Sequence, residues 1–139
     1  MKELAALVSQ IPEFQSLLSA IDSGACPAAV SGLSGVHRAH FAAGVRRETG
    51  RSVVVVCADE TDAQRMAADL SALLGEEVPL LPARAFTFHN AAVVSHQWEH
   101  KRLRVLQALL SGSCGAVVCT VEGLLQRTMP PRADRKSVV

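Results

Sequence analysis

Two valine-rich runs constrain the fold of this chain more than any other feature. Ser52–Ala58 contains four consecutive valines, and Gly115–Thr120 holds a second apolar run. A continuous β-branched run is typical of a parallel strand covered on both faces, so we predict that the first run is a central strand. Parallel strands are joined by right-handed crossovers, which are usually helical. The two runs therefore predict an α/β domain with a parallel sheet.

Helical spacing and helix-ending residues organise the first third of the chain. Apolar residues recur at helical spacing from Leu4 to Ile21, and Pro12 interrupts them, which predicts two short helices or one bent helix. Residues 22–24 end this unit. We expect residues 26–30 to form a short first strand that runs into a turn at 31–35. A helix over residues 36–49 then follows, and Gly50 stops it.

The remainder continues the alternation of strands and helices. Thr61–Gln64 has the pattern of a capping box, which predicts a helix from there to Leu74, with Gly75 as its C-cap. Residues 78–82 are expected to form a strand near a sheet edge because they include two prolines. A loop over 82–92 leads to a helix over 94–110, and a short helix begins near residue 121. In the long helix, the residues expected to face the sheet are Trp98, Leu103, Leu106 and Leu110.

The order of these elements predicts a three-layer, doubly wound α/β domain. The chain has 139 residues, which suits one domain. We divide it into an N-terminal helical segment at 1–25, an α/β domain at 26–129 and a tail or linker at 130–139. Hydrophobic residues make up 49% of the sequence and aromatic residues only 4%, so the core must be built from Ala, Val and Leu.

Charge and cysteine content limit the binding partners and the cellular compartment that we expect. The formal net charge of +1 favours neither autonomous duplex binding nor strong electrostatic steering. No signal peptide or apolar run of membrane-spanning length is evident, so the expected compartment is the cytoplasm. None of the cysteines forms a C-x-x-C pair, and we expect all of them to be reduced, buried thiols: Cys26, Cys57, Cys114 and Cys119.

The turn after the predicted first strand is the first candidate site, because ligands bind at the carboxyl ends of parallel strands. A phosphate loop reads G-x-x-x-x-G-K-[ST], and this chain matches only its first glycine. His37 replaces the second glycine, Arg38 the lysine and Ala39 the hydroxyl that holds Mg²⁺. We expect no productive ATP binding here, although the turn can still hold an adventitious anion. The residues of this degenerate phosphate loop are Gly32, Ser34, Gly35, His37, Arg38 and Ala39.

Two further motifs have functional interpretations. Asp59 and Glu60 follow a predicted strand, like the acidic pair that positions Mg²⁺ in ATPases, but their place in the chain favours helix capping. His96–His100 matches the zinc-protease pattern H-x-x-E-H, in which two imidazoles share a helix face. We find no third ligand for zinc and expect a surface histidine pair. Phe86–His89 is either an exposed contact loop or packs against the sheet edge.

Three features in order resemble the N-terminal region of bacterial transcription-repair coupling factors. They are the degenerate phosphate loop, Leu81–Pro82 leading into Phe86–His89, and the stretch Ala116–Arg127. That region is similar to the first domain of the excision-repair protein UvrB, which carries an intact phosphate loop. The resemblance covers about residues 17–130 and implies a P-loop NTPase fold of the RecA or helicase type, with a degenerate phosphate loop.

The resemblance also implies a function. Coupling factors remove RNA polymerase stalled at DNA lesions and recruit UvrA, mainly through the domain that follows this one. ATP and Mg²⁺ serve a separate downstream translocase, which acts on DNA. The resemblance therefore implies a domain without catalytic residues, cofactor or metal, whose partners are the other domains of the same protein. The alternative is an ATP-binding helicase or translocase domain with an atypical phosphate loop.

Overall fold

A parallel sheet of three strands organises the structure, a computed structural model that describes residues 7–83 and 96–127. The strands are β1 (Val53–Cys57), β2 (Leu80–Leu81) and β3 (Ala116–Thr120), in the spatial order β1-β3-β2. Both pairings are parallel, with Val53 opposite Ala116 and Leu80 opposite Val118. The predicted parallel sheet and the edge position of the proline-flanked strand β2 are confirmed.

The central strand is β3, and every one of its residues is buried. β1 instead lies at an edge of the sheet, so the prediction that the first valine run is central and covered on both faces was wrong. Alternate residues of a strand face opposite sides of a sheet. Val53 and Val55 pack against the main core, whereas Val54 and Val56 are 48% and 45% exposed. The run of β-branched residues indicated a strand but not the number of its neighbours.

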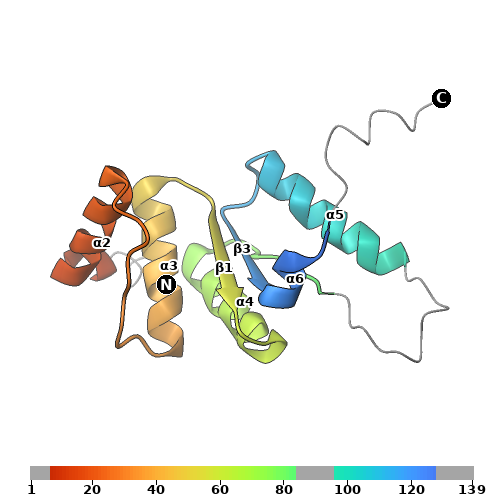
Figure 1. Cartoon of the computed structure of the whole chain (residues 1–139), viewed down its shortest axis with the longest axis horizontal. Helices are drawn as coiled ribbons and strands as arrows, with labels where there is room; N and C mark the ends of the chain where they lie inside the picture. Colours follow the sequence, from red (N-terminus) through yellow and green to blue (C-terminus); the bar gives the residue numbers. More distant parts are fainter. Residues whose placement is uncertain (1–6, 84–95, 128–139) are drawn as a thin grey trace.

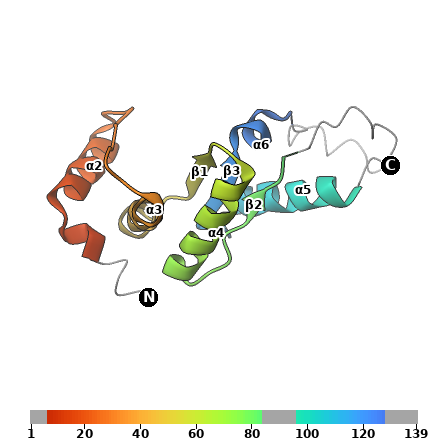
Figure 2. The ribbon, with the colours of Figure 1, turned by 90° about the horizontal axis from the view of Figure 1, so that it is seen from below.

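Helices cover the two faces of the sheet in the predicted three layers (Figures 1 and 2). α3 (Gly35–Thr49) and α4 (Glu60–Leu74) share one hydrophobic cluster with Ala116 and Val118 of β3. α5 (His96–Leu110) packs on the opposite face, where Val105 meets Val117 and Cys119. The short α6 (Val121–Leu125) follows β3 directly, as predicted.

The predicted first strand at 26–30 is not a strand. Cys26–Val30 pairs with none of the described strands, and all five residues are exposed. The segment leaves the end of α2 and runs along the outer side of α3 to reach the start of that helix (Figure 1). Because α2 is anchored on α3, the segment begins away from the edge of β1 and does not reach it.

The N-terminal helices dock on α3, with Pro12 separating them as predicted. η1 (Val8–Gln10) is a 3-10 helix, and α2 (Pro12–Ser23) begins at the proline. Phe14 of α2 is fully buried and meets the Phe41 ring edge-on, with centroids 5.3 Å apart. A Cβ at Gly44 would lie 2.6 Å from a Val8 methyl and 2.7 Å from the Phe14 ring. The missing side chain at Gly44 therefore permits this close approach.

Most helix ends lie where the sequence predicts them, but α4 starts earlier than predicted. Gly50 and Gly75 end α3 and α4 in the left-handed region, at φ 67° and 73°. The capping box predicted at Thr61–Gln64 is wrong, because the N-cap is Asp59, whose Oδ1 accepts the Asp62 N–H at 2.8 Å. Asp59 is extended and lies two residues after the end of β1, which suits an aspartate N-cap and starts the helix two residues earlier than predicted.

The buried face of α5 matches the predicted one only in part, since Leu106 packs against the sheet as expected. Leu103 and Leu110 are exposed, whereas Arg102 and Val105 are buried. The helix therefore turns Arg102 and Val105, which are three residues apart, towards the interior. Three carbonyl oxygens make this orientation possible, as described below.

The cysteines are all free, but they are not all buried. Cys57, Cys114 and Cys119 are buried as expected, whereas Cys26 is exposed because its segment is not part of the sheet. Burial raises the pKa of each of the three buried thiols, and the Asp62 carboxylate raises that of Cys57 further. The folded chain therefore favours the neutral thiol at these three positions.

This burial predicts a loss of stability at alkaline pH. Cysteines in the unfolded chain ionise near pH 8.5. The stabilisation that comes from keeping the buried thiols neutral is therefore complete below that pH and is lost as the pH rises towards the raised pKa values of the folded state. Each buried thiol steepens the loss by up to about 1.4 kcal/mol per pH unit. Urea unfolding with reductant between pH 7.5 and 10 measures the slope. Cys119→Ala should reduce the slope and Cys26→Ala should leave it unchanged; equal slopes in both variants would contradict the assignment.

Candidate functional site

The glycine turn lies where the sequence places it, between Cys26–Val30 and the start of α3. Gly32 has a φ of 80°, a conformation that favours glycine, and α3 begins at Gly35. Ser34 occupies the N-cap position, but its side chain caps no backbone N–H. Its Oγ instead lies 2.9 Å from His37 Nδ1. The imidazole that replaces the glycine of a phosphate loop therefore contacts the turn itself.

Arg38 is held by a carboxylate of the neighbouring helix. Its two terminal nitrogens lie 3.0 and 3.3 Å from the two oxygens of Asp62 on α4. The pair is partly exposed, so it contributes at most about 1 kcal/mol to stability. Its geometry matters more than its energy, because a bidentate pair fixes the plane and direction of the guanidinium. The cation that stands at the lysine position is therefore neutralised within the protein.

Ala39 points into the core. It is fully buried and belongs to the cluster that joins α3, α4 and the sheet. Its methyl group replaces the hydroxyl that would hold Mg²⁺ in a phosphate loop. The last position of the motif therefore serves packing in this chain.

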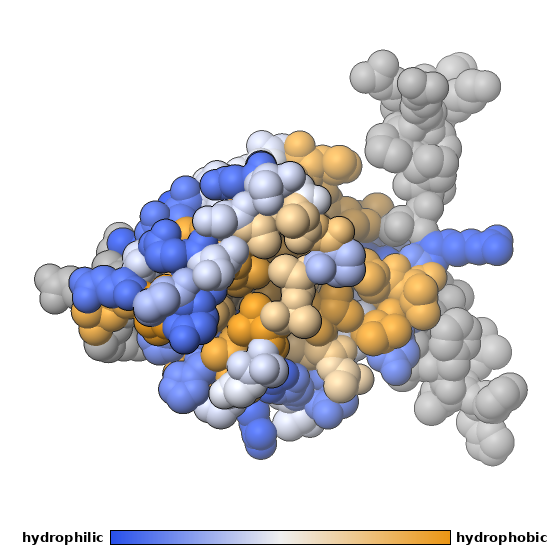
Figure 3. Space-filling view, turned by 60° about the vertical axis from the view of Figure 1, so that its left-hand side comes forward, coloured by the Kyte–Doolittle hydropathy of each residue, from blue (hydrophilic) through white to orange (hydrophobic). Residues whose placement is uncertain are grey.

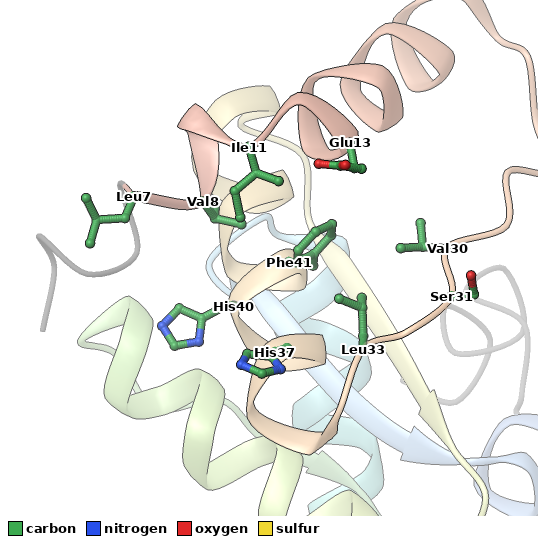
Figure 4. A pocket seen from close by; sticks show the side chains of 10 residues that line it. All are labelled: Leu7, Val8, Ile11, Glu13, Val30, Ser31, Leu33, His37, His40 and Phe41. Atoms are coloured by element: carbon green, nitrogen blue, oxygen red, sulfur yellow. The ribbon is translucent and has the colours of Figure 1, made fainter.

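An apolar pocket of about 460 Å³ lies beside the turn (Figure 4). Val30 and Leu33 form one wall, η1 and the start of α2 form another, and Phe41 projects from α3 between them. Its polar side chains include His37, His40 and the Glu13 carboxylate. A triphosphate needs several N–H donors and cations, whereas this pocket offers mostly apolar carbon, two imidazoles and a carboxylate. The sequence did not reveal the pocket, because helical spacing at 7–14 did not show which element those helices meet.

The carboxyl ends of the three strands border a second cavity, of about 970 Å³. Asp59 and Thr120, which line it, cap the helices that follow their strands: Asp59 caps α4, and Thr120 Oγ1 accepts the Gly123 N–H of α6 at 3.2 Å. The capping interpretation of Asp59 is therefore confirmed. The other charged residues that line this cavity carry both signs of charge: Glu60, Lys101, Glu122 and Arg127.

Arg102 joins the elements beneath this cavity, and sequence reasoning missed it. Its Nη1 donates to the carbonyl oxygens of Pro82 at 3.2 Å and Gly123 at 2.8 Å, and its Nη2 donates to that of Gln126 at 3.0 Å. The guanidinium also lies 5.8 Å from the centre of the Trp98 ring. Burial lowers the pKa of Arg102. The available signal was a tryptophan one helical turn before an arginine, but the flanking Lys101 and Arg104 obscured it.

The other sequence candidates lie on α5 or outside the described residues. α5 begins at His96, and His100 is exposed on it. Within residues 7–83 and 96–127, no three His, Cys, Asp or Glu residues lie close enough to share a metal ion. The zinc interpretation thus lacks a third ligand in that part of the chain. Phe86–His89 lies outside the described residues, as does the tail at 130–139.

The fold and site define a small α/β domain with a parallel sheet and a glycine turn whose cation is paired internally. Among known proteins, the chain is similar to the transcription-repair-coupling factor of Bacillus subtilis, with 26% identity over 132 residues. This match covers 94% of the chain and 11% of the factor, so the chain spans about one ninth of that relative's length. No family model and no solved structure matches the chain significantly. The likeness is a distant homology to one domain-sized part of the coupling factor.

The helices of the described segments are too short or too polar to cross a membrane.

Proposed function

We propose that this chain is a non-catalytic, UvrB-like domain of a transcription-repair coupling factor, with the P-loop NTPase fold and a degenerate phosphate loop. The distant homology to that factor supports the assignment. The observation that supports the absence of catalysis is the environment of two residues in the turn: Arg38 is paired with Asp62, and Ala39 is buried in the hydrophobic core. Neither residue is placed to bind a phosphate or its metal ion.

In this proposal the domain is a scaffold and an intramolecular clamp. It packs against other domains of the same cytoplasmic protein and restrains them until RNA polymerase is engaged. ATP and Mg²⁺ act in a separate translocase that moves on DNA, and UvrA binds mainly through the adjacent domain. The mixed charge of the cavity at the strand ends supports this role, because it favours neither a nucleotide nor a DNA backbone.

A nucleotide titration tests the proposal directly. We expect the melting temperature of the 139-residue chain to be unchanged by Mg²⁺-ATP, whereas a ligand at 100 times its Kd would add about 2.7 kcal/mol of stability. Asp62→Asn, which releases Arg38, should remain equally unresponsive, because His37 and Ala39 still depart from the motif.

A saturable shift with Mg²⁺-ATP, or ATP hydrolysis stimulated by DNA, would instead establish the alternative of an ATP-binding domain. The same titration without Mg²⁺ separates nucleotide binding from an adventitious anion effect. Inorganic sulfate at equal ionic strength provides the second control, since the turn can hold an isolated anion.

A further inference from the structure

The cavity at the strand ends combines apolar walls with an excess of acidic residues. Leu80, Leu81 and Leu125 line it, and Leu125 is 75% exposed. Its charged residues are three acids and two bases, which give a net charge of −1: Asp59, Glu60, Glu122, Lys101 and Arg127. Apolar surface bordered by charge is typical of a site for another polypeptide segment. The sign of the net charge favours an apolar segment that carries positive charge.

Exposed apolar residues of α6 extend the surface beside this cavity. Val121 and Leu124 are 47% and 52% exposed. Figure 3 shows hydrophobic side chains gathered across the middle of one face and continuing to its right-hand side. Contiguous exposed apolar surface on a small domain usually marks a place where another segment or molecule packs.

The described part of the chain ends at this cavity. Arg127 is the last described residue and lines the cavity, so residues 128–139, here called the C-terminal segment, follow directly from its edge. This segment begins with apolar residues, including Met129 and two prolines. Three bases and one acid follow, which give a side-chain charge of +2: Arg132, Asp134, Arg135 and Lys136. The segment therefore has the apolar character and the charge that the cavity favours.

The two prolines suit contact with an apolar wall. Pro130 and Pro131 have no backbone N–H, so an apolar surface leaves no donor of theirs unsatisfied. Proline-rich segments also lose little conformational entropy when they bind. Because the segment is tethered at Arg127, its effective concentration at the cavity is in the millimolar range. The tether therefore favours this segment over the same segment of a second copy.

We propose that the C-terminal segment docks in the cavity at the strand ends. Met129, Pro130 and Pro131 cover Leu125, and Arg132 pairs with Glu122. In parallel α/β sheets, ligands bind in the crevice at the carboxyl ends of the strands. The docked segment is thus an autoinhibitory contact that keeps other ligands out of this crevice. The inference goes beyond the proposed function and does not depend on the glycine turn before α3.

Backbone relaxation measured by NMR on the 139-residue chain tests the contact. We expect order parameters of about 0.8 for the amides of residues 132–134, against values below about 0.6 for a free segment. Leu125→Ser should lower them to the range of a free segment without changing the fold, because Leu125 is exposed. Leu110→Ser, at a position on α5 that is 76% exposed and outside the cavity, is the matched control and should leave them unchanged.

Three results of this measurement would overturn the inference. Low order parameters in the parent chain would show that the segment is free. High values that Leu125→Ser leaves unchanged would place the segment elsewhere. High values that fall on dilution of the protein would identify the segment of a second copy as the occupant.

A charge swap tests the ion pair. Glu122→Lys should speed tryptic cleavage after Arg135 about fivefold, the size of effect expected for an exposed ion pair. Arg132→Glu in the same chain should restore the original rate. Glu77→Lys changes an exposed glutamate outside this cavity and should have no effect. An equal effect of Glu77→Lys, or no restoration by Arg132→Glu, would refute the pairing. Nucleotide binding is a separate measurement, so either proposal can fail without the other.

Discussion

Replacing Arg102 with methionine should lower the free energy of unfolding by about 3–5 kcal/mol. Arg102 is only 4% exposed, and its guanidinium donates to carbonyl oxygens just after β2 and at the end of α6. Methionine preserves the apolar stem, so the loss reports the three hydrogen bonds and the carbonyl groups left without a donor. Urea unfolding at pH 7 measures the difference.

Two matched variants make this result specific. Arg104→Met removes an arginine from the exposed side of the same helix and should change stability by less than about 0.5 kcal/mol. Arg102→Lys should still be destabilising, because one compact ammonium cannot reproduce the planar fork that reaches three carbonyl groups. If Arg102→Met proved as mild as Arg104→Met, the hydrogen bonds of Arg102 to the three carbonyl groups would have no energetic importance.

Replacing Phe14 with alanine should cost about 3–5 kcal/mol, because a fully buried ring would be lost between α2 and α3. Two effects oppose each other in Gly44→Ala. The methyl group would overlap Val8 and Phe14, which costs about 1–3 kcal/mol, while alanine favours the helix by about 1 kcal/mol. We therefore expect a net loss of roughly 1 kcal/mol for this variant.

A double-mutant cycle tests whether the two residues share one interface. In the Phe14→Ala background the methyl group at position 44 has room, so Gly44→Ala should become neutral or stabilising. Leu7→Ala, at an exposed neighbouring position, is the control and should have little effect. Strict additivity of the Phe14 and Gly44 changes would show that the N-terminal helices do not pack on α3 as described.

Much of the fold was predictable from local signals. The valine runs indicated strands, Pro12 separated two helices, and Gly50 and Gly75 ended theirs, because each depends on the conformational preference of a single residue or short run. Local signals did not predict which strands lie next to one another in the sheet. The position of β1 at an edge depends on which other strands are present, and Val53–Cys57 has the same apolar character whether or not a strand pairs with its free edge.

The same distinction between local signals and long-range contacts applies to the candidate site. The residue types at 37–39 predicted that the turn departs from a phosphate loop, since side-chain size and charge follow from the sequence alone. The pairing of Arg38 with Asp62 joins residues 24 positions apart and depends on the packing of α3 against α4. Arg102 likewise finds its carbonyl partners about 20 or more positions away. Such contacts are properties of the assembled fold and leave no periodic pattern.

The burial of Ala39 has an evolutionary consequence. A hydroxyl at that position would enter a close-packed cluster, and a polar group buried there without a partner costs on the order of 1–3 kcal/mol. Any mutational path from this turn to a working nucleotide site must also replace His37 and detach Arg38 from Asp62. The intermediates along that path would be less stable and still inactive, so selection would disfavour them.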